Sequence, residues 1–143
     1  MTGRIPYQAK VRVTTGGGGC PSNGVCIFNA PAIPAGKRLV VQHVVVSVGL
    51  STVPTPSPPG AIETFIQNGN SDTPGPILSS FLVPFIGLNA DVDQAVQFYV
   101  DAGETYFVTV IVRGGNGTLF ATSFNVTGYL LDCSANQCAK IAP

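Results

Sequence analysis

The sequence predicts an all-β chain that folds as an antiparallel β-sandwich of about eight strands in jelly-roll-like order. Runs rich in β-branched and aromatic residues recur along the 143 residues, and this composition is typical of strands. The 17 glycines and 12 prolines fall mostly between these runs, where they mark turns. No segment shows the apolar repeat of about 3.6 residues that an amphipathic helix requires. Many short strands with regular turn signals predict two packed sheets.

Each predicted strand is bounded by turn or loop residues. Pro34–Lys37 and Asp101–Glu104 both contain an Ala-Gly step, which suits a tight turn with glycine at positive φ. The proline-rich segment 51–60 predicts a loop, and Thr73–Pro76 predicts a proline-bearing turn. The strands are expected at residues 8–14, 26–30, 38–50, 61–67, 77–83, 94–100, 105–113 and 118–131.

The run from 38 to 50 is apolar on both faces of the strand that it predicts. Strict alternation places one apolar set on one face, namely Val40, Val44, Val46, Val48 and Leu50. The opposite face then carries Leu39, Val41, His43 and Val45. One face should line the core, and the other should be covered by something else. We therefore expect this second set to contribute to an interface with another copy of the chain.

The length and charge of the chain limit its number of domains and its kinds of partner. We expect one domain over residues 1–143, with a flexible N-terminal strand and Gly-rich turn at 1–19 and a C-terminal disulfide loop and tail at 133–143. Seven basic and seven acidic residues cancel, which argues against nucleic-acid binding and favours a homo-oligomer. No apolar run approaches the roughly 18–20 residues of a membrane helix, so no membrane insertion is expected.

The four cysteines occur as two close pairs, Cys20 with Cys26 and Cys133 with Cys138. Both intervening segments are rich in turn-forming residues, so two local disulfides are the simplest pairing. A four-thiolate zinc site is the alternative, although zinc ligands usually stand two to four residues apart. Disulfides predict a secreted or periplasmic protein, with a signal peptide removed ahead of Met1.

Catalytic machinery is not expected. His43 is the only histidine, and no serine lies in a Gly-x-Ser-x-Gly elbow, so we predict no catalytic residue and no enzyme. Asn89, Asp91 and Asp93 share one face if their segment is extended, and their oxygens are the ligands that calcium prefers. Ordinary turn residues are the alternative for this segment. No other cofactor is expected.

The aromatic residues include four tyrosines and no tryptophan. Exposed aromatic rings commonly form the platforms on which sugar rings stack. Tyr7, Tyr99, Tyr106 and Tyr129 are the candidates for such a platform, and packing in the core or at its rim is the alternative.

Three segments resemble a recurrent pattern. The Pro-Ala-Gly-Lys-Arg-Leu-Val run from Pro34, the Asp-Ala-Gly-Glu-Thr turn from Asp101 and the Gly-Tyr-Leu-Leu-Asp-Cys run from Gly128 are similar to elements of small, uncharacterised secreted bacterial β-sandwich proteins. Those proteins carry a "PAGKRLV" strand and a "DAGxT" turn. The resemblance covers roughly residues 33–133. It implies export and a β-sandwich, and it brings no activity or site residue.

Together these observations predict a non-catalytic exported module that acts through surface contacts and self-associates. A lectin-like, carbohydrate-binding jelly roll with a glycan or cell-surface partner is one alternative, suggested by fold analogy. A structural subunit of a surface layer, filament or virion is the other.

Overall fold

In a computed structural model, which describes residues 4–14, 24–50, 60–113 and 119–133, every regular element is a β-strand. Among these residues no helix has the length and apolar character needed to cross a membrane. The strands are β1 (Ile5–Thr14), β2 (Val25–Asn29), β3 (Lys37–Leu50), β4 (Ala61–Gly69), β5 (Pro74–Pro84), β6 (Asn89–Val100), β7 (Tyr106–Arg113) and β8 (Leu119–Asp132).

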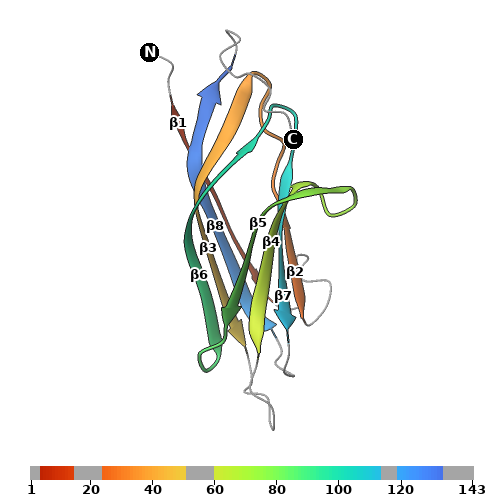
Figure 1. The fold of residues 1–143 in the computed structure, drawn as a ribbon, viewed down its shortest axis with the longest axis vertical. Coiled ribbons are helices and arrows are strands. Elements are labelled where there is room, and N and C mark those ends of the chain that lie inside the picture. Colours follow the sequence, from red (N-terminus) through yellow and green to blue (C-terminus); the bar gives the residue numbers. More distant parts are fainter. Residues whose placement is uncertain (1–3, 15–23, 51–59, 114–118, 134–143) are drawn as a thin grey trace.

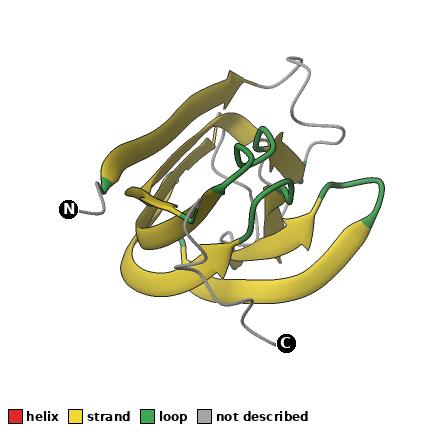
Figure 2. Cartoon of the chain, turned by 90° about the horizontal axis from the view of Figure 1, so that it is seen from above, coloured by secondary structure: helices red, strands yellow, loops and turns green. Residues whose placement is uncertain are grey.

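The strands form two four-stranded antiparallel sheets that face each other (Figures 1 and 2). Sheet A has the order β1-β8-β3-β6, and sheet B has the order β2-β7-β4-β5. This order is that of a jelly roll, in which two Greek keys distribute eight strands over two sheets. The predicted fold class is confirmed. Each predicted strand overlaps an observed one, because turn residues and strand-forming runs alternate so clearly along the chain.

The core lies between the sheets and consists mainly of valines that alternate along the strands. Val44 and Val46 of β3 face Val108 and Val110 of β7 across the interior, and all four are fully buried. The rings of Phe28 on β2 and Phe124 on β8 stack at 5.9 Å between centroids and join the two sheets. Each buried side chain of this size contributes about 1.5–3 kcal/mol, so burial dominates the stability of the sandwich.

A β-bulge in β3 changes which side chains face the core. The pairing of β3 with both neighbours shifts between Val41 and His43, so Gln42 is the extra residue. An extra residue reverses the alternation that follows it. Leu39 and Val41 are therefore fully buried in the same core cluster as Val44.

Our assignment of faces on this strand was wrong for that reason. Leu39 and Val41 expose no surface and cannot form the expected interface, whereas His43 and Val45 face outward and are half-buried. Because of the bulge, apolar residues of β3 on both sides of Gln42 point into the same core. The strand therefore does not require a second copy of the chain against its other face.

The two Ala-Gly turns form as predicted, and the residue just before the first turn is bonded to the second. Gly36 has a φ of 71°, and the Lys37 amide donates to the Pro34 carbonyl at 3.1 Å. Gly103 has a φ of 76°. Two hydrogen bonds of 2.9 Å then join Ile33 to the second turn, one from its amide to Glu104 and one to its carbonyl from Gly103. The turns thereby fix the start of β3 against the end of β6.

Two element boundaries differ from the prediction. Pro74 and Pro76 belong to β5, although their segment was expected to be a turn. β5 is the edge strand of sheet B, where a proline that lacks an N–H need not break a ladder hydrogen bond. β6 begins at Asn89, so the acidic segment that starts there is strand rather than turn.

The cysteines are described in part. Cys26 lies on β2 in the core, and Cys133 follows the last residue of β8. Both are disulfide-bonded, and Cys20 and Cys138 lie outside the described residues. The local pairing therefore stays a prediction.

Candidate functional site

The outward-facing side chains of sheet A form a surface that we call the polar face. Strand register aligns these side chains in rows that cross β1, β8, β3 and β6 in turn. One row contains Lys10, Asn125, Val45 and Asp93. The next contains Arg12, Ser123, Ser47 and Asp91. Each row thus runs from a cation on β1 to a carboxylate on β6, with uncharged residues on the two central strands.

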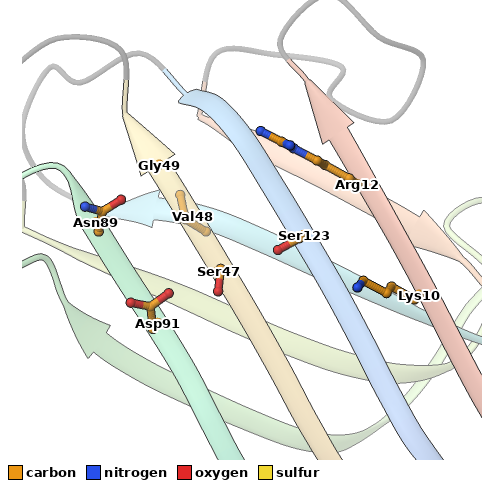
Figure 3. Close-up of a pocket in the computed structure, with 8 residues that line it drawn as sticks. All are labelled: Lys10, Arg12, Ser47, Val48, Gly49, Asn89, Asp91 and Ser123. Atoms are coloured by element: carbon orange, nitrogen blue, oxygen red, sulfur yellow. The ribbon is translucent and has the colours of Figure 1, made fainter.

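A shallow groove of about 430 Å³ crosses the polar face near the C-terminal end of β3. Figure 3 shows Lys10 and Arg12 on one side, Asp91 on the opposite side, and the hydroxyls of Ser47 and Ser123 between them. Val48, Gly49 and Asn89 complete the lining. The groove therefore offers charged groups of both signs, hydroxyls and an amide within one small area.

The charged groups of the groove are free to meet a ligand. Lys10, Arg12 and Asp91 are exposed, and within the described ranges none of them has an ion-pair or side-chain hydrogen-bond partner. Exposed, unpaired charges keep their water shells until a ligand replaces them. They therefore contribute to recognition rather than to stability.

His43 lies on the polar face in contact with Asp93. Its Nε2 atom bonds the Asp93 carboxylate across β3 and β6, and the two side chains are 42% and 72% exposed. No serine or threonine hydroxyl bonds His43 in the part of the chain that the structure describes. The pair therefore lacks the nucleophile that a hydrolytic triad requires.

The predicted calcium ligands follow one another along the outer face of β6. Asn89 and Asp91 line the groove, whereas Asp93 bonds His43. In the described ranges no group of three or more His, Cys, Asp or Glu side chains lies close enough to hold a metal ion. Calcium binding stays a prediction. Of its three predicted ligands, Asn89 and Asp91 lie together in the groove.

The four tyrosines do not form one platform. The hydroxyls of Tyr7 and Tyr106 bond each other at 3.0 Å between the sheets, and Tyr106 is fully buried. Burial and the bond to Tyr7 raise the pKa of Tyr106 well above its ordinary value. Tyr106 cannot contact a ligand, because its side chain fills the space between the sheets.

Tyr99 and Tyr129 lie on the polar face at the end away from the groove. Their positions flank Val40 on β3, and Tyr99 is 37% exposed. The Arg4 guanidinium covers the Tyr129 ring at 4.7 Å, and Gln97 Nε2 donates to the Tyr99 hydroxyl at 2.7 Å. These two rings form a rim of the polar face rather than an open stacking surface.

Four groove residues with polar side chains were absent from our sequence-based candidates, namely Lys10, Arg12, Ser47 and Ser123. The alternation of Gln8, Lys10 and Arg12 was a usable signal, since it marks a strand with one polar face. Nothing in the local sequence indicates that this strand lies beside β8, or that β8 lies beside β3.

No protein-family model and no curated protein matches the chain. Solved structures match at low similarity. Dimeric latent PorU from Porphyromonas gingivalis is 8% identical over 90% of this chain, with a TM-score of 0.40, and the match spans only 14% of PorU. A family 35 carbohydrate-binding module from Clostridium thermocellum is 12% identical, with coverages of 86% and 90% and a TM-score of 0.39.

The structure of infectious bursal disease virus, Gt strain, is 10% identical over 94% of this chain and 33% of its own, with a TM-score of 0.41. These likenesses concern the arrangement of strands and carry no argument about function. The fold and the polar face define the class of protein as a jelly-roll β-sandwich domain with a polar outer groove.

Proposed function

We propose that this chain is a non-catalytic binding module that holds a glycan in the groove of the polar face. The observation that carries the proposal is the lining of the groove, where Lys10, Arg12 and Asp91 surround the hydroxyls of Ser47 and Ser123. Such a lining matches a ligand that presents many hydroxyls, because hydroxyls both donate and accept hydrogen bonds.

The charges indicate the kind of glycan. Lys10 and Arg12 donate to negatively charged groups, and arginine can bind a carboxylate through two parallel hydrogen bonds. Asp91 accepts hydrogen bonds from sugar hydroxyls on the opposite side. We expect an acidic polysaccharide, such as one that contains uronic acids, to bind more tightly than a neutral one. The open, shallow shape suits an internal stretch of a polymer.

Export is part of the same proposal. The two disulfide-bonded cysteines that the structure describes, Cys26 and Cys133, support an oxidising compartment. An exported module meets polysaccharides of cell surfaces and of the extracellular matrix, which are therefore the expected source of the ligand.

Affinity electrophoresis and calorimetry with neutral and acidic polysaccharides, with and without calcium, test the proposal. The double variant Ser47→Val/Ser123→Val should weaken binding by roughly tenfold or more, since each lost hydrogen bond is worth about 1 kcal/mol. Valine is compatible with the strands, so the circular dichroism spectrum should not change.

Thr109→Val is the matched control, because Thr109 is also half-buried but faces outward from sheet B. It should leave binding unchanged. Absence of binding to every polysaccharide, or an equal loss with Thr109→Val, would contradict a glycan site on the polar face.

A further inference from the structure

The two edge strands of sheet A carry opposite charges. β1 and β6 each pair with only one neighbouring strand among the described strands, so the other edge of each is free of strand pairing, apart from a bridge between Asn89 and Ile86 at the start of β6. The charged residues of β1 are Lys10 and Arg12, and those of β6 are Asp91 and Asp93. β1 contains no acidic residue, and β6 contains no basic residue.

This sign pattern decides which edges can meet. Two β1 edges would bring four cations together, and two β6 edges would bring four carboxylates together, so both arrangements are repulsive. A β1 edge beside a β6 edge brings opposite charges together. The charges therefore act against a two-fold dimer through like edges and favour contact between unlike edges.

Strand direction agrees with contact between unlike edges. β1 is antiparallel to β8, β8 to β3, and β3 to β6, so β1 and β6 run in opposite directions. A second copy placed alongside in the same orientation brings its β1 next to β6 of the first copy as an antiparallel neighbour. The sheet can then continue across the contact with the ordinary antiparallel hydrogen-bond pattern.

The register also agrees with this contact. Lys10 shares a row of sheet A with Asp93, and Arg12 shares the next row with Asp91. When the rows continue into the second copy, Lys10 of that copy comes beside Asp93 and Arg12 comes beside Asp91. Asp93 bonds His43 through one carboxylate oxygen, and its side chain is still 72% exposed.

We propose that copies of this chain associate side by side, with β1 of one copy paired to β6 of the next. The interface is heterologous, so association continues until a ring closes or a filament grows. The twist of the sheet rotates each copy relative to the previous one, which gives a curved or helical assembly. The formal net charge of zero adds no overall repulsion between copies.

Sedimentation velocity and light scattering over a range of concentrations at low and high salt test the assembly. The wild-type protein should form oligomers at low salt that dissociate as salt screens the edge charges. The variants Lys10→Glu/Arg12→Glu and Asp91→Lys/Asp93→Lys should each associate at least about tenfold more weakly than the wild type.

An equimolar mixture of the two reversed variants should assemble again. In the mixture the acidic β1 of the first variant meets the basic β6 of the second, and the basic β1 of the second meets the acidic β6 of the first. A loss of folding cannot produce this rescue. Circular dichroism of each variant gives an independent check of the fold.

Two further variants separate this proposal from its alternatives. Leu82→Ser changes a residue of β5 in sheet B that is 68% exposed, and it should leave assembly intact. Ser47→Val/Ser123→Val should also assemble while glycan binding falls. The experiments can therefore contradict the assembly proposal without contradicting the glycan proposal, and the reverse. A wild-type protein that stays monomeric at low salt, a mixture that does not reassemble, or loss of assembly with Leu82→Ser would each overturn the proposal.

Discussion

Tyr7 and Tyr106 form a polar contact inside a largely apolar sandwich. Their hydroxyls are 3.0 Å apart, and Tyr106 is fully buried between the sheets. Buried hydroxyls are usually hydrogen-bonded, and Tyr7 supplies the partner for Tyr106. Burial keeps water from the phenolate form of Tyr106, and the bond to Tyr7 favours the neutral hydroxyl, so the pKa of this group is raised.

The raised pKa of Tyr106 predicts loss of stability at alkaline pH. An unfolded tyrosine ionises near pH 10, whereas the folded one does not, so the unfolded state releases a proton as the pH rises past that value. The stabilisation is complete below about pH 10 and is lost above it. Tyr106→Phe should cost about 1 kcal/mol at neutral pH, and its deficit should shrink toward pH 11.

Urea denaturation at several pH values measures this change in the free energy of unfolding. Tyr99→Phe, on the polar face, is the matched control and should leave the wild-type pH dependence in place. Parallel pH profiles for the wild type and Tyr106→Phe would contradict the assignment.

At the scale of elements, the bulge in β3 is accommodated by a glycine on the neighbouring strand. Gly128 of β8 pairs with Val41, immediately before the bulge. A Cβ atom at Gly128 would overlap the carbonyl oxygen of Val40 and lie 2.9 Å from its carbonyl carbon. The close approach of two backbones thus requires glycine at this position.

Gly128→Ala should therefore destabilise the protein by about 3 kcal/mol, because the obstructing atoms belong to the backbone and cannot rotate away. Gly24→Ala is the matched control, since a Cβ there meets nothing within 4 Å, and it should change stability by less than about 0.5 kcal/mol. Thermal and urea unfolding measure both. Similar small effects at the two sites would show that the strands can separate at the bulge.

On the scale of the whole molecule, Cys26 and Cys133 lie near opposite ends of the sandwich. The sulfur of Cys26 accepts a hydrogen bond from Thr122 near the start of β8, and Cys133 follows the far end of that 14-residue strand. A strand rises roughly 3.3 Å per residue, whereas disulfide-bonded Cα atoms are usually less than about 7 Å apart. A bond between Cys26 and Cys133 is thus sterically excluded.

Chain length also argues against the alternative pairing of Cys20 with Cys133 and Cys26 with Cys138. Cys20 is six residues from Cys26 in the sequence, and six residues extend at most about 22 Å, which is short of the far end of β8. We predict that peptide mapping without reduction will find Cys20 joined to Cys26 and Cys133 joined to Cys138. Cys133→Ser/Cys138→Ser should lower stability by about 2 kcal/mol without loss of the fold. A cross-linked peptide that joins the two pairs would contradict this prediction.

The sequence by itself determined the strands, the two Ala-Gly turns and the sandwich class. These depend on local chemistry, since glycine at positive φ and β-branched runs favour the same structure in many contexts. It also identified β3 as a strand that is apolar on both faces. Alternation could not locate the bulge at Gln42, because a bulge is defined by its pairing with neighbouring strands and leaves no mark in the strand itself.

Only the tertiary structure decided the candidate site. Lys10 and Asp91 are far apart in the chain and come to one groove because jelly-roll topology places β1, β8, β3 and β6 side by side. The same topology puts Lys10 and Arg12 on one edge of sheet A and Asp91 and Asp93 on the other. Charges add to zero in the sequence, and only the order of the strands separates them in space.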